Sequence, residues 1–402
     1  MIRTSDMLFS ISQMGSPLLS VQGNRCVLVR HRKAQCLRCA TVCTSGAIAR
    51  AEDGGISVDP ALCIGCGTCA TVCPSGCLEP LNPTDEELFG QMAKAVAETD
   101  TLVVACSNAA AIAGCSATVE CLGRIDEAFL AEAAARGVRH IVLVEGNCPQ
   151  CAHETGGAVA NDVLAEARML LQAFGSDAVL EKIPVARAIE GGNLLANVLH
   201  CTGANKDATA DASKPTAEDL DFQHVQKDGT LPHFVPERRL RLFNSLKALG
   251  EPQQDAIETK LWGQVSVNTG ICRSCRMCAV FCPTAAIAPY DKEDGTFGIR
   301  HRSALCMQCR LCESICPEHA ITVASEVSLP EFMSGKQFRF EMDPIGWNPS
   351  APDAISSRMA RFFDTDAVQD PQATNKPAEM AARRAFAQKK QAARDDARKS
   401  MQ

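Results

Sequence analysis

The sequence predicts a small α/β domain with a parallel sheet, flanked on each side by a cysteine-rich module that we expect to be α+β. Three observations lead to this prediction. The 23 cysteines of the 402-residue chain gather in separate groups. Similar cysteine runs occur near both ends of the chain, as an internal repeat. Between these ends, short apolar β-rich runs alternate with helical patterns, which is typical of a parallel sheet.

The C-terminal cysteine group holds two complete runs of the form C-x2-C-x2-C-x3-C-P. One extends from Cys272 to Cys282 and the other from Cys306 to Cys316, each followed by proline. In this [4Fe-4S] pattern three close thiolates bind three corners of one cube, and the fourth thiolate binds the other cube. Zinc sites instead separate two cysteine pairs by a dozen or more residues. We therefore predict two clusters, one on Cys272, Cys275, Cys278 and Cys316, the other on Cys306, Cys309, Cys312 and Cys282.

The segment 265–324 resembles a bacterial two-cluster ferredoxin over its whole length. The residues after each run, Thr284–Ile287 and Glu318–Ile321, share in this resemblance. The family's fold is a small pseudo-symmetric α+β unit built from a ββα-type repeat. The resemblance therefore implies a ferredoxin-like module here, and the repeated run implies a second one near the N-terminus.

The N-terminal group contains one complete and one incomplete run. The complete run, Cys63–Cys73, precedes a proline, whereas the incomplete run, Cys36–Cys43, has Lys33 where its leading cysteine would stand. We expect the nearby Cys77 to be a buried small residue. The complete run predicts a cluster on Cys63, Cys66, Cys69 and Cys43.

Three interpretations of the incomplete run remain open. Cys26 supplies the missing ligand across a longer loop, or a three-iron cluster uses the remaining three cysteines, or the site is empty. We favour Cys26, because Val27–Ala34 can form a strand and a turn that return it to the cube. The predicted ligands are then Cys26, Cys36, Cys39 and Cys73.

The region between the modules predicts helices and strands in alternation. Thr84 and Glu87 form a capping box that begins a helix. Two more helices are expected at Ile125–Arg136 and Val159–Phe174. Strands are expected at Thr101–Cys106, His140–Glu145 and Ile183–Ile189. This alternation favours an α/β domain with a parallel sheet.

Cysteines stand where two of these strands end. Cys106 closes the first strand, and Cys148 and Cys151 follow the second. Because the carboxyl ends of parallel strands are where such sheets build sites, we expect a site there. Taken alone, the C-x2-C pair suits a dithiol redox pair, half of a zinc site or a cluster site. We expect Arg124 and Asp126 to fix a turn by hydrogen bonding.

Residues 101–171 resemble the delta subunit of methyl-viologen-reducing hydrogenase, through Thr101–Cys106, Glu120–Asp126 and Val142–Gly156. That iron–sulfur subunit family links hydrogenase or formate dehydrogenase to heterodisulfide reductase. The chain departs from it in having fewer cysteines near the first strand and in carrying Gly146–Pro149 where the family has Gly-Cys-His-Pro. The resemblance implies a [2Fe-2S] cluster on Cys106, Cys121, Cys148 and Cys151, with Cys115 as a substitute ligand.

These observations predict six parts of the chain. They are an N-terminal two-cluster ferredoxin-like module at 22–82, an α/β domain at 84–200, a linker at 202–232, a helical connection at 233–264, a C-terminal two-cluster ferredoxin module at 265–326 and a polar tail at 348–402. The helical connection contains a predicted helix, Glu237–Leu249.

Composition limits the function. A net charge of −7, one Tyr and two Trp argue against nucleic-acid binding. We find no secretory signal pattern and no run of the ~20 apolar residues that cross a bilayer, so we expect no transmembrane segment and a cytoplasmic location. The sequence also lacks a dinucleotide fingerprint, a P-loop and a radical-initiating C-x3-C-x2-C triplet, so no motif supplies a substrate site.

The main hypothesis is an iron–sulfur electron-transfer protein, or a non-catalytic subunit of an oxidoreductase, with four [4Fe-4S] clusters and a [2Fe-2S] cluster. It would pass low-potential electrons between a redox enzyme and another carrier. By resemblance, the partner is a formate dehydrogenase, a hydrogenase or a disulfide-reductase-like flavoprotein. An alternative is an assembly or redox-sensing factor for a partner oxidoreductase. A third hypothesis is thiol–disulfide chemistry at Cys148 and Cys151.

Overall fold

The computed structural model describes residues 18–52, 54–111, 115–190 and 230–343. All of them belong to one compact unit, which ends at Asp343. Cys201, most of the predicted linker (202–229) and the predicted tail (348–402) lie outside the described residues. None of the helices in these four segments is long and apolar enough to cross a membrane.

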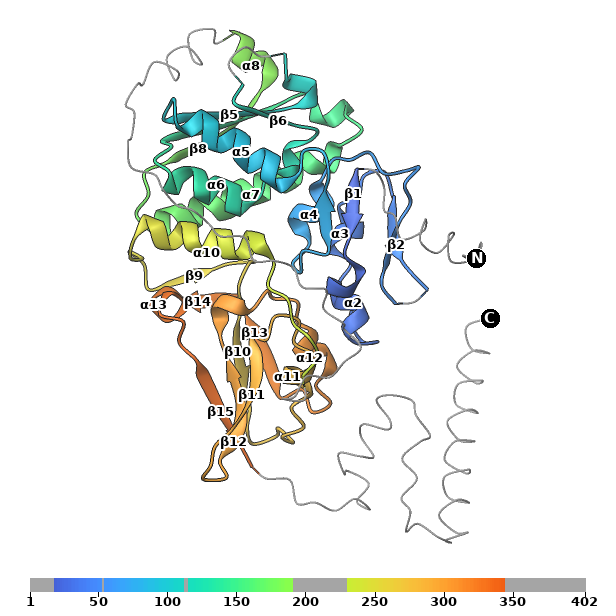
Figure 1. Cartoon of the computed structure of the whole chain (residues 1–402), viewed down its shortest axis with the longest axis vertical. Helices are drawn as coiled ribbons and strands as arrows, with labels where there is room; N and C mark the ends of the chain where they lie inside the picture. The colour runs from blue at the N-terminus through green and yellow to red at the C-terminus, as the bar shows by residue number, and fades with distance from the viewer. Residues whose placement is uncertain (1–17, 53, 112–114, 191–229, 344–402) are drawn as a thin grey trace, which may run out of the picture. The chain divides into compact units, whose positions relative to one another are not determined.

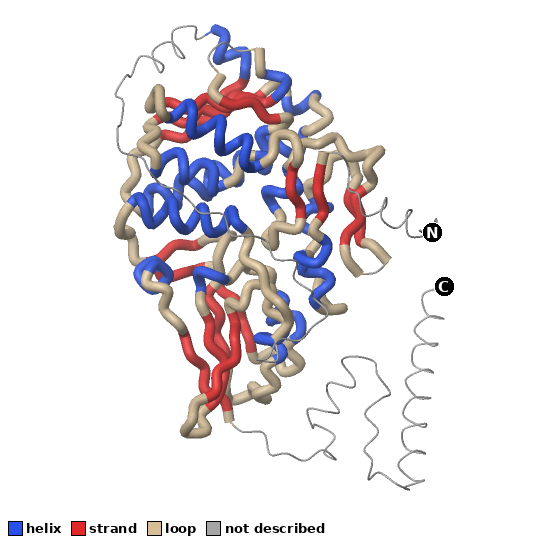
Figure 2. Tube along the Cα trace, viewed as in Figure 1, coloured by secondary structure: helices blue, strands red, loops and turns tan. Residues whose placement is uncertain are grey.

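The middle region folds around a four-stranded parallel sheet, drawn as the upper group of red strands in Figure 2. The strand order is β6-β5-β7-β8. The two central strands, β5 (Thr101–Cys106) and β7 (His140–Glu145), have the predicted bounds. Every residue of β5 is buried, as expected for a parallel strand covered on both faces. The predicted parallel sheet is therefore confirmed, although the sequence patterns did not reveal its edge strand β6 (Ala117–Val119).

Three predicted helices accompany this sheet, α5 (Asp85–Val96), α6 (Glu127–Ala135) and α7 (Glu154–Ala173). The capping box is present, because Thr84 Oγ1 accepts from Glu87 N at 3.2 Å and Glu87 Oε2 accepts from Thr84 N at 2.9 Å. Asp126 caps α6 by accepting from Phe129 N at 2.9 Å, and Arg124 pairs with Asp85. Both residues therefore fix local structure, as expected.

The predicted strand Ile183–Ile189 is wrong. The strand β8 extends over Val179–Pro184, paired with His140–Glu145, and the helix α8 (Val185–Glu190) follows it directly. Proline has no N–H for a further ladder bond, so the strand ends there. The apolar residues after Pro184 belong to the helix.

The N-terminal module consists of two small antiparallel sheets and three short helices. The sheets pair β1 (Leu19–Val21) with β4 (Leu78–Pro80) and β2 (Ile48–Arg50) with β3 (Ile56–Val58). The helices are α2 (Val27–Arg30), α3 (Arg38–Thr41) and α4 (Thr68–Val72). The last two helices each follow the first cysteines of a run, so each cysteine loop leads into a helical turn.

The strand expected within Val27–Ala34 is wrong, because this segment begins as the helix α2. Val29 N donates to Cys26 O at 3.3 Å, and three of the four helical residues are buried. The expected turn is present, closed by a bond from Ala34 N to His31 O at 2.8 Å. Burial of Val27, Leu28 and Arg30 on a helical spacing outweighs the β-propensity of the two valines.

The C-terminal region begins with α10 (Glu237–Leu249), which has the predicted bounds. Three antiparallel sheets follow, pairing β9 with β14, β10 with β13, and β11 with β12 and β15. The strands are β9 (Ala256–Glu258), β10 (Gln264–Val267), β11 (Ile287–Asp291), β12 (Phe297–His301), β13 (Ile321–Ala324), β14 (Glu326–Ser328) and β15 (Phe338–Met342). The short helices are α11 (Met277–Val280), α12 (Leu311–Ile315) and α13 (Leu329–Met333). Because β15 pairs with β12, the sheet extends beyond residue 326.

The helix α10 joins the middle and C-terminal regions into one hydrophobic core. Figure 1 shows α6 and α7 between the parallel sheet and α10, and α10 packs against α6. The same core continues to Trp262 and Phe332, whose rings meet edge to face at 4.7 Å between centroids. The C-terminal cysteine loops are therefore held in a fixed position relative to the sheet.

Candidate functional site

The two C-terminal cysteine runs share an unusual backbone. Six residues other than glycine have positive φ in the described segments, and all lie in these runs or three positions after them. They are Ser274, Arg276 and Ala285 in the first run, and Gln308, Arg310 and His319 at the same positions in the second. Residues with side chains rarely adopt this backbone conformation, so these loops are under backbone strain. The strained turns let each loop curve around the space between its thiols.

The complete N-terminal run has the same turns but places glycine in them. Gly65, Gly67 and Gly76 have positive φ at the three equivalent positions. The incomplete run keeps only the last of these, at Gly46, and Leu37 has a φ of −128°. The incomplete run Cys36–Cys43 therefore lacks both the leading cysteine and the two positive-φ turns that would wrap the loop around a cube corner.

Each predicted C-terminal ligand set gathers around one central thiol, that of Cys278 or that of Cys312. Burial raises the pKa of Cys278 and of Cys312, and neighbouring thiols raise both further. The thiols that act on Cys278 are those of Cys275, Cys272 and Cys316. The thiols that act on Cys312 are those of Cys309, Cys306 and Cys282, with a smaller effect from Cys278 of the other set. The structure therefore brings together the cysteines that the spacing assigned to each cube.

The N-terminal sets gather in the same way. Burial raises the pKa of Cys69, and it raises that of Cys39 to about 12. The pKa of Cys69 is raised further by the neighbouring thiols of Cys66, Cys39, Cys63 and Cys43. The pKa of Cys39 is raised further by those of Cys73, Cys26 and Cys36. A hollow between the strands and loops of this module is lined by all four cysteines of the complete set, Cys43, Cys63, Cys66 and Cys69.

These donor sets fit [4Fe-4S] clusters. Thiols crowded in a low-dielectric site resist ionising, because burial and like charge both disfavour the thiolate. Coordination to iron deprotonates a thiol outright and shares the charge with the metal. When bound, such a cluster accepts and releases single electrons, and the protein tunes it by hydrogen bonds, charge and burial.

Cys26 and Cys77 lie side by side at the incomplete set. Hydrogen bonding between the two thiols lowers the pKa of Cys26 to about 7 and raises that of Cys77. The directions of the two shifts favour ionisation of Cys26, with Cys77 as the hydrogen-bond donor. Cys77 is only 1% exposed, which agrees with the expectation of a buried small residue. The close approach of Cys26 to Cys36 and Cys39 favours Cys26 over an empty corner.

The middle region has a pocket at the carboxyl ends of β5 and β7. Asn108, Glu145 and His153 line this pocket. It is also lined by all four cysteines that the resemblance named, Cys106, Cys121, Cys148 and Cys151. Cys115 does not line this pocket, and its thiol donates to Ala117 O at 2.9 Å. In the segments that the structure describes, no three His, Cys, Asp or Glu side chains gather around a single-ion site. A [2Fe-2S] cluster instead takes two thiolates on each of its two irons.

Hydrogen bonds to sulfur surround this pocket. Gly146 N donates to Cys106 Sγ at 3.2 Å, and Asn108 Nδ2 donates to Cys151 Sγ at 3.2 Å. Such bonds stabilise thiolates and tune a bound cluster. The sequence pattern did not single out Asn108 or Glu145, because neither belongs to a cysteine motif.

Cys148 is poorly suited to act as a free nucleophile. Burial and then Glu145, whose Oε2 accepts from Cys148 Sγ at 3.4 Å, raise its pKa to about 11. Reactive dithiols have lowered pKa values, so the pocket favours metal ligation over thiol–disulfide exchange.

The middle pocket adjoins the complete N-terminal set. Burial raises the pKa of Cys121 to about 12, and Cys66 is the first neighbouring thiol that raises it further. The backbones approach so closely that a side chain at Gly123, in the 3-10 turn Leu122–Arg124, would meet Thr68 Oγ1 of α4 at 2.5 Å. The two sites therefore share one wall.

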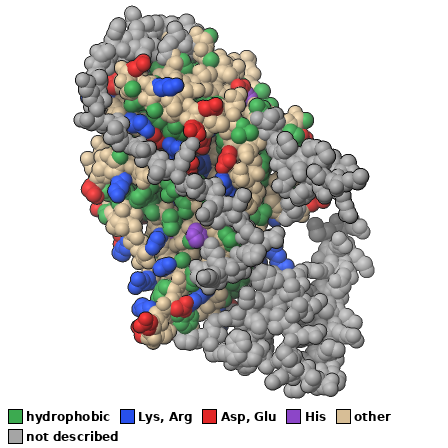
Figure 3. Space-filling view, in the orientation of Figure 1, with side chains coloured by type: hydrophobic (Ala, Val, Ile, Leu, Met, Phe, Trp, Pro, Cys, Tyr) green, Lys and Arg blue, Asp and Glu red, His purple; other side chains and the backbone are tan. Residues whose placement is uncertain are grey.

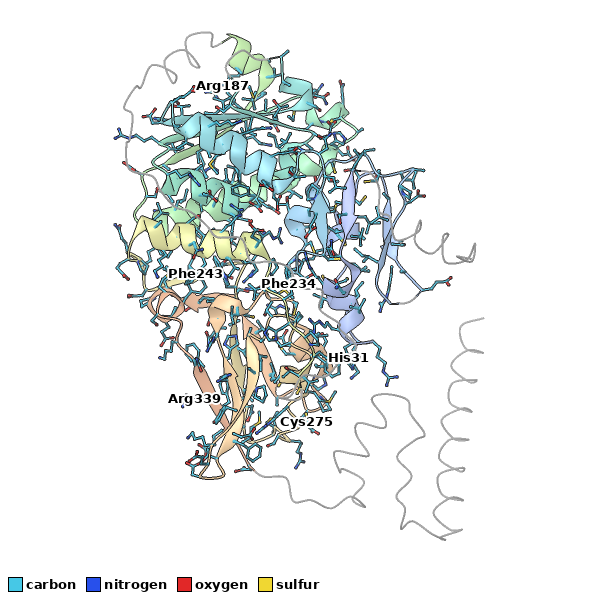
Figure 4. The ribbon with its side chains drawn as sticks, viewed as in Figure 1. His31, Arg187, Phe234, Phe243, Cys275 and Arg339 are labelled. Carbon is cyan, nitrogen blue, oxygen red and sulfur yellow. The ribbon has the colours of Figure 1, made fainter. Side chains whose placement is uncertain are left out.

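The incomplete N-terminal set adjoins the C-terminal region. Burial raises the pKa of Cys309 to about 12, and Cys36 is among the thiols that add to the shift. His31, at the end of α2 in Figure 4, meets the ring of Phe281 edge to face at 4.9 Å. These contacts join segments that lie far apart in the sequence.

Comparisons with known proteins agree with the cysteine runs. Residues 271–320 match the 4Fe-4S dicluster domain, and residues 56–79 match the 4Fe-4S binding domain. A 55-residue segment is 47% identical to the isethionate sulfite-lyase activating enzyme of Nitratidesulfovibrio vulgaris, over 14% of this chain and 17% of that relative. The chain thus contains ferredoxin-type 4Fe-4S domains near its N-terminus and in its C-terminal region, and [4Fe-4S] clusters are its cofactors.

Proposed function

We propose that this chain is an electron-transfer protein that holds four [4Fe-4S] clusters on the cysteine sets described above and a [2Fe-2S] cluster in the middle pocket. The middle domain, with its resemblance to the hydrogenase delta subunit, then forms one end of the series. We retain the predicted order of domains, begin the N-terminal module at β1 and add β15 to the C-terminal module. A reducing cytoplasm suits such a protein.

One observation carries the proposal: the five ligand sets adjoin in a single series. The middle pocket meets the complete N-terminal set through Cys121 and Cys66, and the incomplete set meets the C-terminal region through Cys36 and Cys309. Within each module the two sets also adjoin, since Cys39 neighbours Cys69 and Cys278 neighbours Cys312. A structural or sensing role needs no such series, whereas electron transfer does.

The order in space differs from the order in the chain. The middle domain lies at one end of the series and the Cys272 set at the other, with the N-terminal module between them. We propose that a low-potential redox enzyme, either a dehydrogenase, a hydrogenase or a flavoprotein, docks at one end and a second carrier at the other. The face drawn in Figure 3 mixes acidic and basic side chains, unlike the clustered Lys and Arg of nucleic-acid binders.

The alternative is an assembly or redox-sensing factor. The relative from Nitratidesulfovibrio is an activating enzyme, but the similarity spans 17% of its length, so we do not transfer its activity to this chain. A redox titration of the anaerobic protein, monitored by EPR, separates the two functions. Reversible reduction of the clusters at low potential supports electron transfer. Clusters that stay inert, or that move intact to an apo-enzyme, contradict it.

Ligand variants test the middle site in the same preparation. Cys148→Ser should remove about two irons per chain, since it deletes one pocket ligand. Cys115→Ser is the matched control, because Cys115 lies outside the pocket and a serine hydroxyl can replace its bond to Ala117 O. Equal iron contents in the two variants would contradict the middle cluster.

A further inference from the structure

Three arginines converge on the backbone of one C-terminal ligand set. Arg239 of α10 donates through Nη2 to Cys306 O at 2.8 Å. Arg38 of the N-terminal module donates to Gln308 O at 3.0 Å, and Arg30 donates to Pro283 O at 3.4 Å. The accepting carbonyls belong to the loops that carry Cys306 and Cys309, and to the proline that follows Cys282. Three separate segments thus supply positive charge to one site.

Two of these guanidinium groups are buried, with 5% exposure for Arg30 and 8% for Arg239. Burying a charge is unfavourable unless an opposite charge compensates it. Arg239 bonds only to the neutral carbonyls of Leu261 and Cys306, and its Nε has no partner. Among the described residues Arg239 forms no ion pair with a carboxylate, and the acidic groups acting on it are the thiols of Cys306 and Cys309, followed by Glu127. A thiolate-bound cluster on these cysteines would supply negative charge directly beside this arginine.

The other C-terminal set has a different electrostatic environment. Of its two loop arginines, Arg276 is neutralised by two bonds to Asp291, of 3.0 and 2.5 Å, and Arg273 is exposed. The acidic Glu318 lies near Cys272 and acts against its ionisation. The two sets share a backbone conformation, but only the Cys306 set is bonded by a buried arginine, Arg239, that forms no ion pair among the described residues.

We propose that Arg239, Arg38 and Arg30 form a cationic cradle that raises the reduction potential of the cluster on Cys306, Cys309, Cys312 and Cys282 above that of its C-terminal neighbour. The inference rests on the proposed function. A cluster bound there would accept one electron from the adjoining sites of the series, and the guanidinium groups would stabilise the added negative charge. An electron that enters the C-terminal module therefore occupies this site in preference to the Cys272 set.

Burial acts in the opposite direction, because a low-dielectric site disfavours the more highly charged, reduced form. Three cations at the loop outweigh this effect, since two of them are themselves desolvated and so weakly screened. These arginines are positioning residues: they touch the ligand loop and act on the cluster through charge.

Arg239→Gln removes the charge and keeps hydrogen-bond donors, so it isolates the electrostatic effect. We expect at least a tenfold change in the one-electron equilibrium, which corresponds to a fall of about 59 mV in one midpoint potential. Arg239→Lys should restore most of it. The matched control is Arg241→Gln, on the same helix, whose guanidinium pairs with Glu237 at 2.6 Å and with Glu132 at 3.6 Å and has no hydrogen bond to the ligand loop among the described residues.

The assay is an EPR redox titration of the full chain with iron counted in each preparation. The signal of the cradle site is assigned as the component lost in Cys312→Ser. An unchanged midpoint in Arg239→Gln at full iron content would overturn the cradle, as would a higher potential at the Cys272 set of the unmodified chain. If Arg239→Gln loses iron, the midpoint potential of Arg38→Gln is measured in its place, and an unchanged midpoint at full iron content would overturn the cradle. A chain that holds only about eight irons refutes the proposed function instead.

Discussion

Gly156 stands where the middle pocket meets the N-terminal module, and replacing it with alanine tests that contact. It lies in the first turn of α7, and an added methyl group would overlap Cys121 Sγ and approach Thr68 Oγ1 to 3.1 Å. Both neighbours are buried, and Cys121 is one of the proposed ligands. The methyl group can be accommodated only if Cys121 moves away from the pocket.

The size of the effect follows from two opposing contributions. Overpacking a buried site costs about 1–3 kcal/mol, whereas alanine in place of glycine favours a helix by roughly 1 kcal/mol. We expect Gly156→Ala to lower the free energy of unfolding by about 1 kcal/mol. Gly90→Ala in α5 is the matched control, because nothing lies within 4 Å of its added methyl group. That variant should gain about 0.5–1 kcal/mol.

The assay compares anaerobic preparations of both variants by iron content and thermal unfolding. Gly156→Ala should lose about two irons, because the displaced thiol no longer binds the middle cluster. Its unfolding midpoint should lie roughly 3 °C below that of Gly90→Ala. If Gly156→Ala keeps its iron and matches the control in stability, Cys121 is not held where the structure places it.

Two other predictions concern buried groups. Cys26→Ala should lose iron and Cys77→Ala should not, because Cys26 adjoins both Cys36 and Cys39 and its pKa is the one that is lowered. The reverse result in iron analysis would make Cys77 the ligand. Burial lowers the pKa of His301 to about 4, so below its ordinary pKa of 6.5 the unfolded chain gains a proton that the folded chain does not. His301 should therefore contribute a fall of about 2 kcal/mol in the free energy of unfolding from pH 8 to pH 5. Because burial also lowers the pKa of His31 to about 4, a fall remains in His301→Leu, but urea unfolding should show it about 2 kcal/mol smaller than in the unmodified chain. An equal fall in both chains would contradict the assignment.

Local patterns predicted the elements whose periodicity is regular. β5, β7 and α10 have the expected bounds, because their apolar residues follow one period from end to end. The predictions failed where one residue overrides the pattern. Pro184 ends β8 early, and the buried face of α2 makes a helix from a valine-rich segment.

The ligand sets are predicted from the cysteine spacing, because cube geometry fixes that spacing. The contacts between sets were not, since they depend on how the modules pack. Arg38 reaches the carbonyl of a residue 270 positions away, and no local pattern predicts such a pair. Two adjacent arginines of α10 also form contacts that no local pattern predicts. Arg238 donates to Ala70 O of the N-terminal module, and Arg239 donates to Cys306 O of the C-terminal module.

The central claim is that five cluster sites form one series in this chain. Counting iron and labile sulfide in the anaerobically purified protein, with EPR of its reduced form, tests this claim most directly. We predict about eighteen irons per chain, from four cubes and one [2Fe-2S] cluster, with EPR signals of both cluster types. About eight irons, confined to the two C-terminal sets, would contradict the account.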